Sequence, residues 1–208
     1  MVGHLLQYHS IFKTIRKIVN AGEIGELNYV YSNRLSFGKV RSEEDVIWSF
    51  APHDISMILS LTNQYPELVT TSSASILQKN IVDTATIHLT FKSGLKSHIS
   101  VSWLHPHKEH KLVVIGKTAM LVFDDTKAWN EKLALHSYEI ASSKKLINLK
   151  KSDVKYLEVI EDEPLKNECQ HFIDVVEKDI QPLTGGAEGL RVVKVLNAAS
   201  LSQNKKNI

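Results

Sequence analysis

Apolar residues recur every three to four positions in four stretches of the chain. The first covers residues 9–21 and is followed by Gly22, and the second lies around Pro52. A third begins at Pro164, a residue that suits the first turn of a helix, and the last covers residues 187–201. Because this spacing places apolar side chains on one side of a helix, the sequence predicts four amphipathic helices.

The pattern changes to alternation between residues 84 and 104. Within 84–91 and 95–104, apolar side chains occupy mostly every second position, and Thr, Ser, His and Lys occupy the others. Alternation predicts β-strands with one apolar and one polar face, here joined by a hairpin turn at 92–94. Further strands are predicted over 26–37, 111–115 and 120–123.

The predicted elements follow the order helix, strand, helix, several strands and two helices. This order indicates an α+β fold, an open-faced antiparallel β-sheet with helices packed on one face. The segment 124–153 has no clear period and is expected to be less regular. Since the chain contains no repeat or low-complexity segment, we expect residues 1–208 to form a single domain.

The charge balance bears on the class of partner. The 208 residues include 25 Lys and Arg against 23 Asp and Glu, a formal net charge of +2, which gives no electrostatic footprint for a phosphate backbone. Nucleic acid is therefore not expected as a partner. A membrane is not expected either, because no apolar run approaches the ~20 residues of a spanning helix, and the first residues do not resemble a secretory signal.

The single cysteine, Cys169, cannot form an internal disulfide. Its place in a predicted helix indicates a small buried packing residue, and a lone thiol suits a reducing compartment. We therefore expect a cytoplasmic protein. The sequence contains no Gly-rich dinucleotide loop, Walker loop, paired-Cys zinc motif or Gly-x-Ser-x-Gly motif.

The first candidate for chemistry is His53, in the segment 48–54. We place it in the first turn of a helix, where the positive end of the helix dipole disfavours the imidazolium cation. An imidazole that stays neutral near pH 7 can act as a general base. The alternative is that His53 only caps the helix or packs under Trp48.

A second candidate is a polar group at the end of the strand over 26–37. It consists of Asn33, Arg34, Lys39 and Arg41. Its three cations suit a diphosphate or a carboxylate, because a guanidinium offers a bidentate fork and an ammonium a point charge. The alternative is that these are ordinary exposed charges at a strand end.

The third candidate lies at the end of a later strand, where Trp103 and His105 are followed by His107 and His110. Three neighbouring histidines suggest a metal. However, no carboxylate recurs at a fixed spacing, and in an extended chain His110 does not share a side with the other two. We expect no metal and place Trp103 and His105 beside a substrate cleft, with the three-histidine metal site as the alternative.

Several segments of the sequence resemble one protein family. They are Gly3–His9, Tyr31–Leu35, Trp48–Ser56, Val101–Pro106 and Glu188–Val192. Together they are similar to the C-terminal domain of the Gfo/Idh/MocA oxidoreductases. Within that family they most resemble the nucleotide-sugar 3-dehydrogenases that act on UDP-N-acetylglucosamine or its uronic acid. The similarity extends from Val2 to about Leu201.

The resemblance implies an NAD-dependent enzyme of two domains. It assigns His53 to the helix-borne histidine that assists removal of the hydroxyl proton, together with a lysine of the first domain. Many relatives carry an Asp four residues before this histidine, where the present chain has Ser49. Arg34, Lys39 and Arg41 fall where this branch is expected to contact the nucleotide-sugar. The family's N-terminal NAD-binding domain is missing from the 208 residues, which therefore resemble a truncated product, a split gene product or an excised domain.

Two functional hypotheses follow. In the first, the chain is the substrate-binding and oligomerisation domain of an NAD-dependent dehydrogenase acting on a hydroxyl of a sugar or UDP-sugar. It would bind no cofactor and be inactive alone, and a separate cofactor domain would act in trans. In the second, it is a non-catalytic interaction module derived from such an enzyme. The polar face of the predicted sheet suggests, in either case, a homodimer or homotetramer formed through that face.

Overall fold

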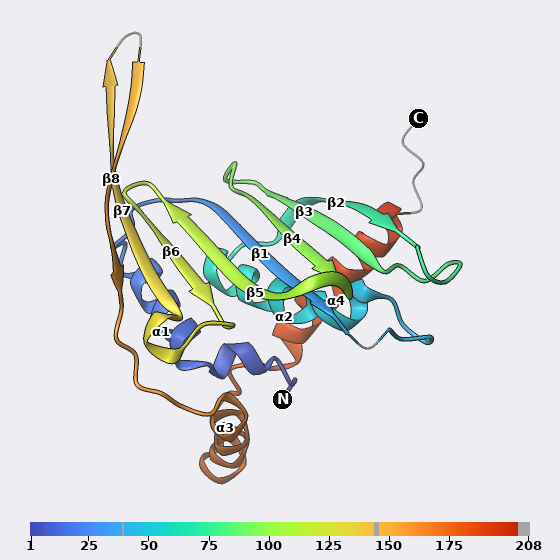
Figure 1. Cartoon of the computed structure of the whole chain (residues 1–208). Coiled ribbons are helices and arrows are strands. Elements are labelled where there is room, and N and C mark those ends of the chain that lie inside the picture. Colours follow the sequence, from blue (N-terminus) through green and yellow to red (C-terminus); the bar gives the residue numbers. More distant parts are fainter. Residues whose placement is uncertain (39, 144–145, 204–208) are drawn as a thin grey trace.

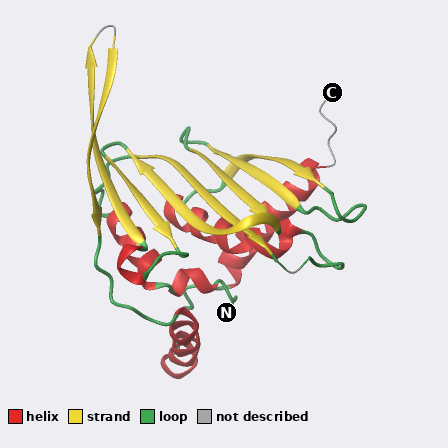
Figure 2. Ribbon diagram, viewed as in Figure 1, coloured by secondary structure: helices red, strands yellow, loops and turns green. Residues whose placement is uncertain are grey.

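The computed structural model describes residues 1–38, 40–143 and 146–203. Over these residues the chain forms one eight-stranded sheet with helices over one of its faces (Figures 1 and 2). The elements are, in chain order, the 3₁₀ helix η1 (Leu5–Tyr8), α1 (Ser10–Asn20), β1 (Leu27–Phe37), α2 (Val46–Thr62), β2 (Pro66–Ala74), β3 (Thr84–Phe91), β4 (Lys96–Ser102), β5 (Leu104–Gly116), β6 (Ala119–Asp124), the 3₁₀ helix η2 (Trp129–Glu131), β7 (Leu133–Ser143), β8 (Leu146–Tyr156), α3 (Pro164–Lys178) and α4 (Gly186–Gln203).

The sheet has the strand order β2-β3-β4-β1-β5-β6-β7-β8. Its strands pair antiparallel except β1 and β4, which run parallel, so the predicted α+β fold with an open sheet is confirmed apart from this pair. The exception arises because β1 is inserted between β4 and β5, which follow each other in the sequence. The chain therefore crosses the end of β1, where the Gly38 amide donates to the Trp103 carbonyl at 3.2 Å, instead of turning back in a hairpin.

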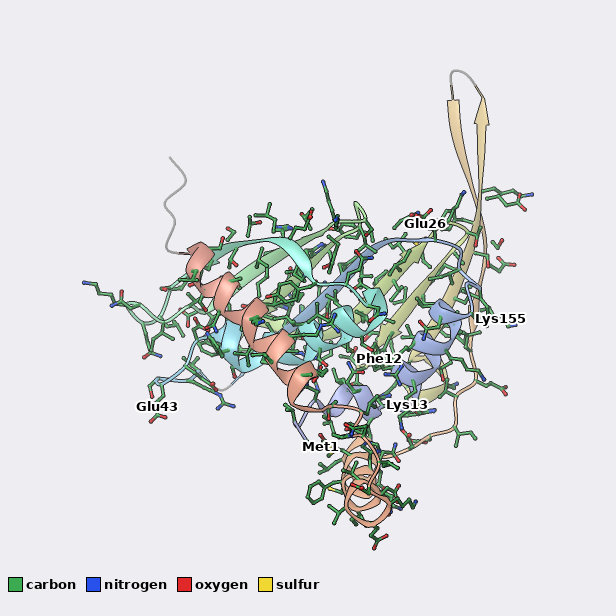
Figure 3. The ribbon with its side chains drawn as sticks, turned by 180° about the vertical axis from the view of Figure 1, so that it is seen from behind. Met1, Phe12, Lys13, Glu26, Glu43 and Lys155 are labelled. Atoms are coloured by element: carbon green, nitrogen blue, oxygen red, sulfur yellow. The ribbon has the colours of Figure 1, made fainter. Side chains whose placement is uncertain are left out.

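The core lies between the sheet and the helices α1, α2 and α4, a layer that Figure 3 shows from behind with Phe12 labelled. The apolar stripes of these helices meet the apolar face of the sheet, because that is the arrangement that removes both from water. Phe12, Ile55 and Val195, one from each helix, are fully buried, as are Ile87 and Val101 of the sheet. The other face of the sheet carries no helix in the described part of the chain (Figure 2).

Helix α2 begins earlier than the sequence indicated. The carboxylate of Asp45 accepts a hydrogen bond from the Trp48 amide at 3.0 Å and caps the helix, and Pro52 lies inside it. His53 is therefore about two turns from the helix N-terminus. Because the effect of the helix dipole decays within the first turn, the predicted dipole contribution to His53 is wrong.

The segment 124–153, predicted to be irregular, mostly forms strands. β7 and β8 pair antiparallel as a long hairpin that extends beyond the rest of the sheet (Figure 1). Beyond the sheet body this hairpin has no helix to cover it, so its sequence does not need the strict apolar alternation that marks β3 and β4.

Helix α3 occurs where Pro164 predicted it, but its apolar stripe is not buried. Cys169 is exposed, and Phe172 and Val176 are 52% and 68% exposed. The prediction that Cys169 packs in the core is therefore wrong. The reason is that α3 stands apart from the sheet (Figure 1) and buries Glu168 instead, on the side facing η1.

Among the described residues, no helix combines the length and the apolar character needed to cross a membrane.

Candidate active site

A buried ion pair joins the sheet to α2. Arg34 of β1 donates from Nε to Oδ2 of Asp54 at 2.6 Å and from Nη2 to Oδ1 at 3.3 Å. The Ser32 hydroxyl, also on β1, donates to the same carboxylate. The Asp54 residue is 1% exposed, so its charge is stabilised by these donors and not by water.

The ion pair also fixes the position of His53, because His53 directly precedes Asp54 on α2. Its Nδ1 is buried and has no hydrogen-bond partner among the described residues. Burial lowers the pKa of His53, and the nearby Arg34 guanidinium and His4 lower it further against the opposing effect of the Asp54 carboxylate. The imidazole is therefore neutral near pH 7, as the sequence indicated, but the cause is desolvation and a neighbouring cation.

Ser49 lies one turn before His53 on the same helix. Its hydroxyl oxygen is also buried and unpartnered among the described residues. Since residues four apart lie on one face of a helix, the two polar groups share a side of α2. A hydroxyl both donates and accepts, so unlike a carboxylate it imposes no single tautomer on the imidazole.

His110 is the site residue whose position the sequence reasoning missed. It lies directly opposite Arg34 in the β1–β5 register. Burial, followed by the Arg34 charge, lowers its pKa to about 4. Together with Arg34 and Asp54 it lines a cavity of about 10 Å³, room for roughly one water. The sequence grouped His110 with two other histidines because it could not show which strand lies beside β5.

The segment before η1 adds a second charged contact. His4 Nδ1 lies 2.6 Å from Oε2 of Glu188, and the Ser56 hydroxyl donates to Oε1 of Glu188 at 2.6 Å. His4 is 7% exposed and acts electrostatically on His53. These contacts tie the N-terminal segment and α4 to the side of α2 that carries His53.

The polar group predicted at the end of β1 is not assembled. Arg34 is committed to Asp54, whereas the Asn33 side chain, on the other face of the strand, donates to Glu109 at 2.7 Å. Arg41 is exposed and pairs with Glu44 at 2.8 Å. Lys39 lies outside the described residues. Neighbouring positions of a strand point to opposite faces, so a shared pocket for Asn33 and Arg34 was excluded by geometry.

The predicted contacts at the end of β4 are also separated. Trp103 is 0% exposed and donates from Nε1 to Asp83 at 2.6 Å, so it belongs to the core and not to a cleft wall. His105 is half-buried, and its Nδ1 lies 2.7 Å from the His107 carbonyl oxygen. Within the described ranges, no group of three or more His, Cys, Asp or Glu side chains is placed to hold a metal ion.

Comparisons with a family model and with solved structures point to the same family of proteins. A family model described as the GFO/IDH/MocA C-terminal domain matches residues 12–122. A comparison with curated proteins found no match. Among solved structures, UDP-N-acetylglucosamine 3-dehydrogenase GnnA from Acidithiobacillus ferrooxidans superimposes with a TM-score of 0.77 at 20% identity, over 98% of this chain and 63% of that chain.

Two further structures show the same fold. Aldose-aldose oxidoreductase from Caulobacter crescentus has a TM-score of 0.80 at 13% identity, over 98% of this chain and 61% of its own. An oxidoreductase from Agrobacterium radiobacter, solved with NAD+, L-tartaric acid and magnesium, has a TM-score of 0.72 at 17% identity, over 98% and 62%. The chain thus spans less than two thirds of the length of each of these structures.

The ion pair leads to a stability prediction. Replacing Asp54→Asn leaves Arg34 inside the protein without its counter-charge, and we expect the free energy of unfolding to fall by about 3 kcal/mol or more. Urea denaturation measures this change. The matched control is Glu44→Gln, which breaks the exposed pair with Arg41 and should cost at most about 1 kcal/mol. Equal losses in the two variants would contradict the role given to the buried pair.

The histidines lead to a pH prediction. His110 has a pKa of about 4 in the fold against about 6.5 in the unfolded chain, so the unfolded state binds the proton more readily. Its contribution to stability is complete above pH 6.5 and is lost as the pH falls towards 4. We expect His110→Gln to flatten the decline in unfolding free energy between pH 6.5 and 4.5, by at most ~1.4 kcal/mol per pH unit.

Thermal or urea unfolding at a series of pH values gives this slope. His107→Gln, which alters an exposed histidine, is the control and should keep the slope of the unmodified protein. An unchanged slope in His110→Gln would show that its proton is not linked to folding.

Proposed function

Because the chain belongs to the GFO/IDH/MocA family, an oxidoreductase family, we propose that it is the substrate-binding domain of an NAD-dependent dehydrogenase. The substrate class that we propose is a sugar or nucleotide-sugar, oxidised or reduced at a hydroxyl-bearing carbon. The observation that carries the proposal is the neutral, half-buried His53, with its buried Nδ1, beside the Arg34–Asp54 pair. The names of two similar structures, a UDP-N-acetylglucosamine 3-dehydrogenase and an aldose-aldose oxidoreductase, support the substrate class.

In this proposal His53 takes the proton of the substrate hydroxyl, the carbon that bears this hydroxyl loses a hydride, and the C–O bond becomes a carbonyl. An oxidised nicotinamide on a separate domain would be the hydride acceptor. The imidazole is neutral at the start because burial and Arg34 disfavour its cation. Arg34 makes two hydrogen bonds to Asp54, and we propose that N–H groups of its guanidinium with no partner among the described residues bind a substrate oxygen. Of the residues predicted to bind substrate, Arg34 is therefore the one that the proposal retains next to His53.

The described residues do not fit NAD. Gly185 precedes α4 and Gly186 is its first residue, but the pair follows Pro182–Thr184 and not a strand, and a Cβ on Gly186 would meet no atom within 4 Å. A dinucleotide loop needs glycine where the backbone approaches the pyrophosphate, between a strand and a helix. We therefore propose that a separate domain supplies the nicotinamide, and we assign no step to NAD on this chain.

The uncovered face of the sheet supports a further part of the proposal, self-association. His98 stacks on Tyr31, with ring centroids 5.1 Å apart, and its Nδ1 lies 2.7 Å from the Tyr29 hydroxyl. These contacts hold large side chains rigid on a face that no described helix covers, which lowers the entropy lost on binding. We propose that this face pairs with a second copy of the chain. A purely non-catalytic interaction module would use the same face, so binding of substrate separates the two hypotheses.

A binding experiment tests the substrate proposal. We expect UDP-N-acetylglucosamine to bind the purified chain weakly in isothermal titration calorimetry and to perturb the imidazole resonances of His53 in NMR. NAD should give no measurable heat. Substitution His53→Asn should change nucleotide-sugar affinity by less than roughly threefold, because His53 acts on a proton, while lowering kcat by roughly 10²–10⁴ when the cofactor domain is present. Tight NAD binding, or no response to any sugar or UDP-sugar, would contradict the proposal.

Light scattering tests the self-association. The double variant Thr86→Glu/Ser100→Glu places two like charges where the hydroxyls face each other across β3 and β4, at 3.5 Å. We expect the unmodified chain to be at least a dimer and the variant to be a monomer. The control, Gln181→Glu/Asn197→Glu, adds the same charge at exposed positions outside the strands, on α4 and in the segment before it, and should leave the mass unchanged. A monomeric unmodified chain at high concentration would overturn this part.

A further inference from the structure

A second and larger cavity lies in the helical layer, the side of the molecule seen in Figure 3. Its volume is about 270 Å³, against the ~10–15 Å³ that one water needs. The polar side chains that line it come from η1, α1, α2 and its C-cap, and α4: Gln7, Arg16, Ser56, Ser60, Asn63, Glu188 and Arg191. No residue lines both this cavity and the small one between Arg34 and His110.

The two arginines of this cavity have unused binding capacity. Arg16 donates one hydrogen bond, from Nη1 to the Gln7 side chain at 3.3 Å, and Arg191 donates one, from Nη2 to the Gln64 carbonyl at 2.9 Å. A guanidinium carries five N–H donors. Within the described part of the chain, neither arginine forms an ion pair with a carboxylate. Both side chains are half-buried, so water screens their charges less than on an open surface.

One carboxylate, Glu188, also lines the cavity, and each of its oxygens has a partner other than the two arginines. Oε2 is 2.6 Å from His4 Nδ1, and Oε1 accepts the Ser56 hydroxyl at 2.6 Å. Glu188 is thus held by partners outside the two guanidinium groups. The cavity therefore combines two guanidinium groups that pair with no carboxylate of the described residues, one carboxylate that is hydrogen-bonded elsewhere, and the neutral donors of Ser60 and Asn63.

We propose that this cavity binds a small oxyanion of the phosphate class. An anion matches the site in charge, because the two guanidinium groups outnumber the one carboxylate, Glu188. It also matches in geometry, because a guanidinium donates two parallel hydrogen bonds to adjacent oxygens. The ligand is either free phosphate or the phosphate group of a small monoester, and the two share this chemistry. Because the cavity shares no lining residue with the site at Arg34 and His110, the proposal stands independently of the dehydrogenase function.

Calorimetric titration of the full chain with inorganic phosphate at constant ionic strength tests the site. We expect saturable binding that becomes roughly 10- to 100-fold weaker in Arg16→Gln, because a charged hydrogen-bonding partner is lost. Arg191→Gln should have a similar effect. The matched control is Arg41→Gln, an exposed arginine that does not line the cavity, and it should bind phosphate like the unmodified chain.

Arg191 also holds the Gln64 carbonyl, so its variant is accompanied by circular dichroism to verify folding. Arg16→Lys provides a second variant, since it keeps the charge and loses the bidentate geometry, and it should bind phosphate with intermediate affinity. A parallel titration with glycerol 3-phosphate distinguishes the sources, because tighter binding of the ester identifies a phosphate monoester as the ligand class. No saturable heat with either anion, or equal affinity in Arg16→Gln and Arg41→Gln, would overturn the proposal.

Discussion

The buried pair between Arg34 and Asp54 is the interaction on which the candidate site depends. It links the central strand to the helix that carries His53, so it fixes the position of the imidazole relative to the sheet. It also controls charge, because Asp54 is occupied by Arg34 and the Ser32 hydroxyl. Without this pairing the nearest carboxylate would stabilise the imidazolium. With it, burial and the nearby positive charge lower the pKa of His53 by more than Asp54 raises it, so the base remains neutral.

Much of the fold could be predicted from local patterns. The alternation over 84–91 matches β3 residue for residue, and Pro164 marks the first residue of α3. The resemblance to the Gfo/Idh/MocA C-terminal domain is confirmed by the match over residues 12–122. What local patterns could not show was the insertion of β1 between β4 and β5, because pairing between distant strands leaves no period in either strand.

The candidate site was predictable in its residue types but not in its groupings. His53 and Arg34 were both selected from the sequence, and the structure places them within electrostatic reach of each other. His110 joined them only through the β1–β5 register, which brings residues 34 and 110 face to face. Trp103 looked like a cleft residue because it ends a strand, yet the chain crosses the end of β1 at that point and buries it. In each case a contact between distant segments decided the role.

The central position of β1 also has a consequence for how the chain folds. Tyr29 pairs with Lys96 on one side and with Ile115 on the other, so both neighbours of this strand lie more than 60 residues further along the chain. Closing such long loops carries an entropic cost before any contact rewards it, and a high contact order slows folding. During synthesis β1 emerges from the ribosome long before either partner. The two edges of β1 therefore lack their partners until β4 and β5 have been synthesised. During this period the strand is most exposed to aggregation.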